Sequence, residues 1–177
     1  MNILLLGIIG SGKTSVGQRL AELLTYQFME LDEVVLAHGG GAVGEDPYVH
    51  NQVYWSECEL EVSKDISLDT KQVIATGGGF AENNLNILYF KEHGPVAVIY
   101  LHATPETLSD RFLSIIDKER IARHELTDKM GALYARRDAQ YRVCADLVVD
   151  TDKKTVKEVV SKMNKYLKQT YPKHFGG

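Results

Sequence analysis

The stretch that decides the fold of this chain lies near its start and reads Gly7-Ile8-Ile9-Gly10-Ser11-Gly12-Lys13-Thr14. It follows a short apolar run at residues 3–6 and precedes a helical pattern that begins at Thr14. The spacing Gly-x4-Gly-Lys-Thr between a buried strand and a helix is typical of a phosphate-binding P-loop. A glycine-rich turn without a function would not need the closing Lys-Thr pair.

The physical chemistry of such a loop predicts a nucleotide site. Glycines let backbone N–H groups turn inward around phosphates, and the helix N-terminus adds the positive end of its dipole. Lys13 should reach the β- and γ-phosphates, and the Thr14 hydroxyl should coordinate Mg²⁺. We therefore expect ATP and Mg²⁺ as cofactors. The predicted nucleotide-binding residues of the loop are Gly7, Gly10, Ser11, Gly12, Lys13, Thr14 and Ser15.

Strands alternate with helices along the rest of the chain. Apolar runs predict strands at residues 3–6, 28–32, 73–76, 96–101 and 147–149. Amphipathic patterns predict helices after the P-loop, after a Thr-Pro cap and after a capping box near the end of the chain. This order predicts an α/β fold: a five-stranded parallel sheet flanked by helices, with the strand at 3–6 in the centre and ligands beyond the strand C-termini.

Two segments interrupt the alternation inside what should be one domain, 1–177. Residues 33–70 contain a glycine triplet and one helical pattern, and they predict an inserted substrate-binding subdomain. Residues 117–126 are short, charged and flanked by helices, which is typical of a mobile lid. The helical pattern of the subdomain places four side chains on one face: Trp55, Cys58, Val62 and Ile66.

Composition excludes several classes of protein. The net charge of −4 over 177 residues gives no electrostatic support for binding nucleic acid or an anionic membrane. The apolar start lacks the basic segment and cleavage site of a secretory signal, and no run approaches a membrane span. Cys58 and Cys144 lie far apart in the sequence and lack the spacing of a metal site, so we expect two reduced thiols. We expect a cytoplasmic monomer whose partners are small molecules.

Acids and glycines follow the strands beside the P-loop. Glu30 and Asp32 lie two residues apart on the second predicted strand, so their side chains should point to the same face. One could then serve Mg²⁺ and the other a substrate hydroxyl, although both could also be solvated acids. The stretch Gly77-Gly78-Gly79 ends the third strand, where the absence of side chains would let a substrate lie against the backbone.

Taken together, these segments resemble the shikimate kinases, small P-loop kinases related to the nucleoside monophosphate kinases. The resemblance covers nearly the whole chain and implies a P-loop kinase fold. It implies transfer of the ATP γ-phosphoryl group to a hydroxyl of a small anionic polyol, with shikimate to shikimate 3-phosphate as the expected reaction, in aromatic amino acid biosynthesis. Besides the P-loop, the matching segments are Glu30-Leu31-Asp32, Ala75-Thr76-Gly77-Gly78-Gly79, Tyr100-Leu101, Arg111 and Ala135-Arg136-Arg137 with Tyr141 and Ala145.

For the nucleotide, the resemblance implies three further residues. Arg111 matches an arginine that stacks on adenine, and Lys153 lies in the segment that corresponds to the loop on the other side of that base. Arg120 falls at the lid arginine that approaches the transferring phosphate. The lid of the family reads Arg-Pro-Leu, whereas this chain has Arg120-Ile121-Ala122-Arg123, so Arg123 is an alternative lid arginine.

For the acceptor, the resemblance assigns Asp32 to the hydroxyl that is phosphorylated and Glu30 to Mg²⁺. Gly77, Gly78 and Gly79 match substrate-contacting glycines. Arg137 matches an arginine that holds the substrate carboxylate, a task that suits its planar fork of donors.

The chain departs from the family pattern at a second carboxylate clamp. The family motif Phe-Arg-x-x-Glu has no match, because the chain reads Val53-Tyr54-Trp55-Ser56-Glu57 and contains no arginine between Arg19 and Arg111. Depending on register, Tyr54 or Trp55 replaces the arginine, which makes Tyr54 a candidate substrate-binding residue. A lost charge-assisted contact costs about 1.5 to 3 kcal/mol. A kinase for another sugar acid or a nucleotide is therefore one alternative, and a nucleotide-binding regulator without turnover is another.

Overall fold

The structure is a computed structural model that describes residues 1–38, 52–66, 71–114 and 123–175. Five strands form one parallel sheet in the order β2-β3-β1-β4-β5. This confirms the predicted five-stranded parallel sheet with the first strand in its centre. The strands are β1 (Asn2–Leu6), β2 (Gln27–Glu30), β3 (Gln72–Ala75), β4 (Val96–His102) and β5 (Leu147–Asp150).

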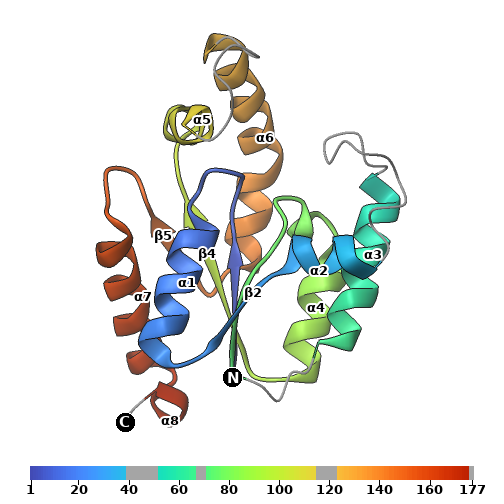
Figure 1. Ribbon diagram of the computed structural model, residues 1–177, viewed down its shortest axis with the longest axis vertical. Helices are drawn as coiled ribbons and strands as arrows, with labels where there is room; N and C mark the ends of the chain where they lie inside the picture. The colour runs from blue at the N-terminus through green and yellow to red at the C-terminus, as the bar shows by residue number, and fades with distance from the viewer. Residues whose placement is uncertain (39–51, 67–70, 115–122, 176–177) are drawn as a thin grey trace.

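Helices cover both faces of the sheet. Figure 1 shows α1 and α7 on one side and α2, α3 and α4 on the other, while α5 and the N-terminal part of α6 stand at the top of the view. The helices are α1 (Lys13–Leu24), α2 (Leu31–His38), α3 (Gln52–Asp65), α4 (Asn84–His93), α5 (Pro105–Leu113), α6 (Arg123–Cys144), α7 (Val156–Thr170) and α8 (Pro172–Phe175), with a short 3-10 helix η2 (Phe80–Glu82).

The central strand β1 is buried on both faces, which explains its continuous apolar sequence. Leu4 and Leu6 pack into the core beneath α2, α3, α4 and α6. Ile3 and Leu5 pack into the second core, beneath α1 and α7. Successive side chains of a strand point to opposite faces, so one strand anchors both layers of helices. The P-loop therefore begins at a rigid point, directly after β1.

The second predicted strand is too long. The sequence predicts a strand over residues 28–32, whereas β2 ends at Glu30 and α2 begins at Leu31. Leu31 and Val35 are both fully buried and stand four residues apart, so burial on one helical face outweighs an extended conformation here. Asp32 lies in the first turn of α2, where an acid is favoured by the helix dipole. The expectation that Glu30 and Asp32 share one strand face is wrong.

The inserted segment holds more helix than the sequence predicts. Residues 33–70 contain the rest of α2 as well as α3, rather than a single helix, and the two helices pack against each other. The predicted lid, residues 117–126, overlaps the start of α6, because residues 123–126 form the first turn of that helix. Residues 117–122, with Arg120, and the side chain of Tyr54 lie outside the described residues. The predicted roles of Arg120 and Tyr54 stay predictions.

In the described residues, no helix has both the length and the apolar content that crossing a bilayer requires. Both cysteines are free thiols, with Cys144 buried and Cys58 partly buried.

Candidate active site

A cavity of about 500 Å³ opens at the carboxyl ends of β1, β2 and β3. Three strand ends supply its walls, because the P-loop follows β1, Glu30 ends β2 and Thr76 follows β3. The structure thus brings together most of the predicted site residues at the carboxyl-end edge of one sheet. The predicted residues that line the cavity are Gly10, Gly12, Lys13, Thr14, Ser15, Glu30, Asp32, Gly78 and Arg111.

The backbone of the P-loop requires its glycines. Gly10 and Gly12 have φ angles of 84° and 95°, which side-chain-bearing residues rarely adopt. A Cβ on Gly10 would also come within 3.0 Å of the Leu108 carbonyl oxygen. The loop closes on itself through a hydrogen bond from Ser11 N to Ile8 O (3.0 Å), and the buried Ser11 Oγ has no partner among the described residues. An unpaired hydroxyl in a glycine loop fits a site that receives a polar ligand.

Lys13 lies across the loop it belongs to. Its Nζ donates to Gly7 O (2.7 Å) and to Ile8 O (3.3 Å). Burial lowers the pKa of Lys13 to about 8, although Asp32 and Glu30 oppose that shift. The ammonium thus lies in the cavity and is held by two neutral backbone oxygens, which a phosphate with its higher charge could replace.

The two predicted magnesium residues meet directly. Thr14 Oγ1 donates to Glu30 Oε2 at 2.9 Å. Burial raises the pKa of Glu30, while the hydrogen bond from Thr14 and the charge of Lys13 act in the opposite direction. A hydroxyl and a carboxylate are hard oxygen ligands, and Mg²⁺ in such sites is held by one or two carboxylates together with phosphates and water. The residues present fit a Mg²⁺ ion at the mouth of the P-loop.

Arg111 joins the P-loop to the loop that follows β5. Its Nη1 donates to Gly10 O (3.3 Å) and to Thr151 Oγ1 (3.0 Å), and its Nη2 donates to Thr151 O (2.7 Å). These bonds hold the guanidinium at the edge of the cavity. Lys153, in contrast, is exposed on a tight turn with φ 54° and does not line the cavity.

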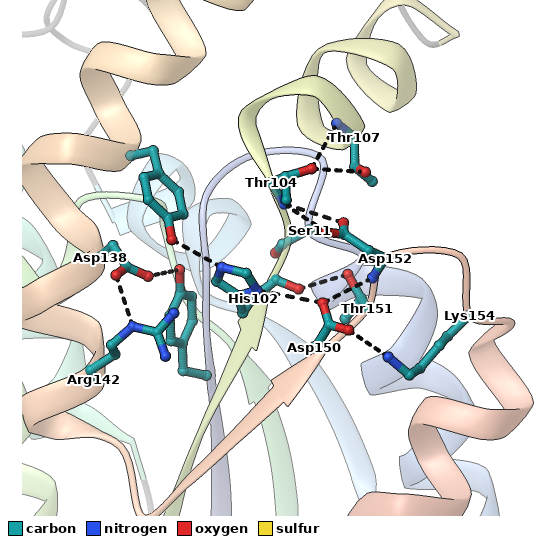
Figure 2. A network of polar contacts seen from close by, with 12 residues as sticks. Ser11, His102, Thr104, Thr107, Asp138, Arg142, Asp150, Thr151, Asp152 and Lys154 are labelled. Atoms are coloured by element: carbon teal, nitrogen blue, oxygen red, sulfur yellow. Dashed lines mark hydrogen bonds and ion pairs between the residues drawn. The ribbon is translucent and has the colours of Figure 1, made fainter.

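A polar network fixes the loop after β5 and the start of α5 (Figure 2). Asp152 accepts from the backbone N–H of Thr104, the N-cap of α5, and Thr151 Oγ1 donates to His102 O. His102 bridges Asp150, at 3.5 Å from Nδ1, and the hydroxyl of Tyr134, at 3.0 Å from Nε2. The network therefore runs from Thr151, which accepts from Arg111, to Tyr134 on α6, the helix that also carries Arg137.

The acceptor side of the cavity begins at Asp32. Its Oδ1 is buried and accepts no hydrogen bond from the described residues. Burial raises the pKa of Asp32, and the charge of Lys13 lowers it in part. A Cβ at Gly77, two residues after the end of β3, would lie 2.5 Å from Asp32 Oδ1, so a glycine at this position leaves room for the carboxylate. A buried carboxylate oxygen without a hydrogen bond is unfavourable, so a hydroxyl donor from a ligand would be stabilised here.

Sequence reasoning missed Glu59. This residue is 2% exposed, accepts from Trp55 Nε1 (3.2 Å), and would lie 2.8 Å from a Cβ at Gly77. Burial, reinforced by the charge of Asp32, raises the pKa of Glu59 to about 8. The signal was present in the sequence, because Glu59 stands four residues after Trp55 and three before Val62, on the face predicted to point inward.

Arg137 lies against the glycine triplet that follows β3, Gly77-Gly78-Gly79. A Cβ on Gly78 would come within 3.3 Å of its Nη1, and a Cβ on Gly79 within 3.6 Å of its Nη2. Its side chain is 11% exposed, and its Nε donates to Glu82 at 2.5 Å. The Tyr141 hydroxyl donates to Gly78 O and helps hold α6 against the triplet.

The alternative lid arginine points elsewhere. Arg123 donates to Asp110 from Nε (2.9 Å) and Nη2 (2.5 Å), and both side chains are largely exposed. Arg123 does not line the cavity. It joins the start of α6 to α5.

Comparison with known proteins identifies the family. The shikimate kinase family model matches residues 9–168. The chain belongs to the shikimate kinase family. A shikimate kinase from Enterococcus faecalis is 30% identical over 172 residues, which cover 95% of this chain and 99% of that protein. A shikimate kinase from Caldanaerobacter subterraneus is 32% identical, covering 92% of this chain and 93% of that protein.

Solved structures agree with this membership. The shikimate kinase from Acinetobacter baumannii, in complex with shikimate, superposes with a TM-score of 0.80 and 27% identity, covering 96% of this chain and 94% of that chain. Members of the family are ATP-dependent kinases that phosphorylate an alcohol, and this shikimate kinase family member is an enzyme of that class.

Proposed function

We propose that this protein transfers the γ-phosphoryl group of ATP to a hydroxyl of shikimate, giving shikimate 3-phosphate and ADP. One observation carries the proposal: a single cavity is lined both by the phosphate-binding loop and by Asp32, whose Oδ1 accepts no hydrogen bond from the described residues. That arrangement suits a donor phosphate and an acceptor hydroxyl side by side. The shikimate kinase from Acinetobacter baumannii, which was solved in complex with shikimate, supports this acceptor.

On the donor side, the chain supplies positioning and charge. The P-loop N–H groups hold the phosphates, and Lys13 moves from its backbone oxygens to the β- and γ-phosphates. Thr14 and Glu30 would hold Mg²⁺, which neutralises charge on the phosphates when it is bound. Arg111 would stack on the adenine, with Lys153 near the other side of the base.

On the acceptor side, Asp32 orients the hydroxyl. The substrate O–H donates to Asp32 Oδ1, and the proton passes to this carboxylate as the oxygen attacks phosphorus and the bond to ADP breaks. The glycine triplet leaves room for the polyol against the backbone. Arg137 receives the carboxylate with its terminal nitrogens.

The position of Glu59 changes the expected place of the missing arginine. If Glu59 is the acid of the family motif Phe-Arg-x-x-Glu, the arginine position is Ser56, rather than Tyr54 or Trp55. Ser56 Oγ accepts from Asn83 Nδ2 at 3.0 Å, so a neutral hydrogen bond stands where a cation would be. We expect shikimate to bind through one arginine, with Arg120 serving the transferring phosphate, in a monomeric cytoplasmic enzyme.

A coupled assay of ADP release tests the proposal. Wild-type protein with ATP and Mg²⁺ should turn over with shikimate, and the product should carry phosphate on the 3-hydroxyl by phosphorus NMR. A panel of sugar acids and nucleosides measures alternative acceptors. Turnover with another acceptor and not with shikimate would refute the substrate assignment, and nucleotide binding without any turnover would favour a regulator.

A further inference from the structure

Glu82 stands directly beside the proposed carboxylate clamp. It ends η2, three residues after Gly79, and its backbone N–H donates to Gly79 O at 2.8 Å. This bond fixes the start of the Glu82 side chain relative to the glycine triplet. Its Oε1 accepts from Arg137 Nε (2.5 Å) and from Arg136 Nε (3.0 Å). One carboxylate oxygen of the protein therefore already engages the arginine that would receive the substrate.

The geometry leaves only part of the guanidinium for a ligand. A carboxylate can approach an arginine end-on, through both terminal nitrogens, or side-on, through Nε and one terminal nitrogen. Glu82 occupies Nε, whereas Nη1 and Nη2 face Gly78 and Gly79. Glu82 therefore takes the side-on position at Nε, so a substrate carboxylate would have to use the terminal nitrogens, and the charge of Arg137 is already balanced by a neighbour.

Other charged groups around the glycine triplet further reduce the net positive charge that a substrate would meet there. Burial is the main cause that raises the pKa of Glu59, and among the charges Asp32 and Glu82 raise it while Arg137 lowers it. The negative charge of Glu82 therefore acts on Glu59, which lies beside Gly77 on the acceptor side of the cavity. Arg136, which shares Glu82, is about half exposed, so water screens it. The sequence offers no second arginine from the subdomain.

We propose that Glu82 determines acceptor selectivity by competing with the carboxylate of the acceptor for Arg137. This inference rests on the proposed function, because it assumes that Arg137 faces that carboxylate. The acceptor is then selected mainly through its hydroxyls, at Asp32 and the glycine triplet, and its negative charge contributes little to binding. The class of acceptor that fits such a wall is a polyol whose acid group is tolerated rather than strongly bound.

The test compares shikimate with its uncharged methyl ester in wild type and in Glu82→Gln. Glutamine keeps an oxygen that can accept from Arg137 Nε and removes the charge. Relief from a partly screened like charge should lower the KM for shikimate about three- to tenfold. The KM for the ester, the KM for ATP and kcat should all stay within about twofold, because the ester carries no charge for Glu82 to repel.

Glu22→Gln is the matched control. It makes the same change in net charge at an exposed ion pair with Arg19 on α1, away from the cavity. It should leave the KM for both acceptors unchanged. A change equal to that of Glu82→Gln would mean that overall charge, and not Glu82, controls the affinity.

Three results would overturn the proposal. The KM for shikimate could rise in Glu82→Gln, which would mean that Glu82 orients Arg137 in favour of the substrate. Shikimate and its ester could respond equally, so that charge is not the cause. In wild type alone, the ester could bind more than about tenfold more weakly than shikimate, as expected for an unopposed charge-assisted clamp. This last comparison needs no variant and holds even if Glu82→Gln folds poorly.

Calorimetry separates this proposal from the proposed function. If wild type shows no turnover with shikimate, the assignment of the reaction fails. A gain of shikimate affinity without a gain for the ester in Glu82→Gln still supports the competition, and no gain refutes it.

Discussion

The two walls of the cavity differ in how they are built. The phosphate wall comes from one continuous stretch, the P-loop, whose residues contact each other within a few positions. The acceptor wall is built around the glycines after β3, where Asp32 of α2 and Gly78 line the cavity and Glu59 of α3 and Arg137 of α6 lie behind them against the glycines. The first wall follows its sequence motif residue by residue, whereas the second departs from the family pattern. A local motif carries its own backbone geometry, but a wall assembled from distant segments can change one contributor at a time.

The largest effect should come from the phosphate wall. Lys13→Ala removes the ammonium that serves the transferring phosphate, so kcat should fall more than a hundredfold, by about the loss seen for a preorganised donor. Circular dichroism should show an intact fold, because Lys13 belongs to neither hydrophobic core. Turnover within tenfold of wild type would show that Lys13 does not act on the phosphate.

Asp32→Asn asks whether the acceptor wall acts separately from the phosphate wall. An amide cannot take the hydroxyl proton, so kcat should fall about a hundredfold or more. The KM for ATP should stay nearly unchanged, because Asp32 serves the acceptor. A parallel fall in nucleotide affinity, measured by calorimetry, would place Asp32 on the donor side.

Ser56→Arg tests the register that Glu59 indicates. A second charge-assisted contact should lower the KM for shikimate about tenfold or more, because Glu82 does not balance the charge of this new arginine. Gln18→Arg adds the same charge at an exposed position of α1 and should leave the KM for shikimate unchanged. If Ser56→Arg has no effect while an arginine at Tyr54 or Trp55 does, the motif aligns on Glu57 instead.

The smallest effect concerns stability and its dependence on pH. The folded-state pKa of Glu59, about 8, lies above its ordinary value of 4.5, so the folded protein holds this proton more tightly than the unfolded chain. The associated stability is present below pH 4.5 and is lost as pH rises toward and through 8. Glu59→Gln mimics the protonated form. Its free energy of unfolding relative to wild type should increase by about 1 to 3 kcal/mol between pH 5 and pH 8.5.

Glu57→Gln is the control for that measurement, because Glu57 is exposed on the same helix. Urea titrations at both pH values would measure the two differences. A pH-independent difference for Glu59→Gln would mean that the Glu59 carboxyl is already ionised in the folded protein at pH 5.

The same contrast between walls explains what the sequence could predict. The strands, the central position of β1 and the P-loop follow from local patterns of apolar residues and glycines. The strand assigned through Asp32 was wrong because burial of Leu31 and Val35 on a helical face decides the conformation there. Glu59 could have been found from the inward face of α3. The pairing of Glu82 with Arg137 joins residues 55 positions apart, and no local pattern reports it.

Lys13 has a consequence for the heat of nucleotide binding. Without a phosphate its pKa is about 8, so at that pH about half of the molecules lack this proton. Phosphate oxygens favour the charged ammonium, and binding must draw the missing protons from the buffer. Each nucleotide should take up about half a proton at pH 8 and about a tenth at pH 7. The heat measured in HEPES and Tris buffers should therefore differ at pH 8, in proportion to their ionisation enthalpies, and nearly coincide at pH 7.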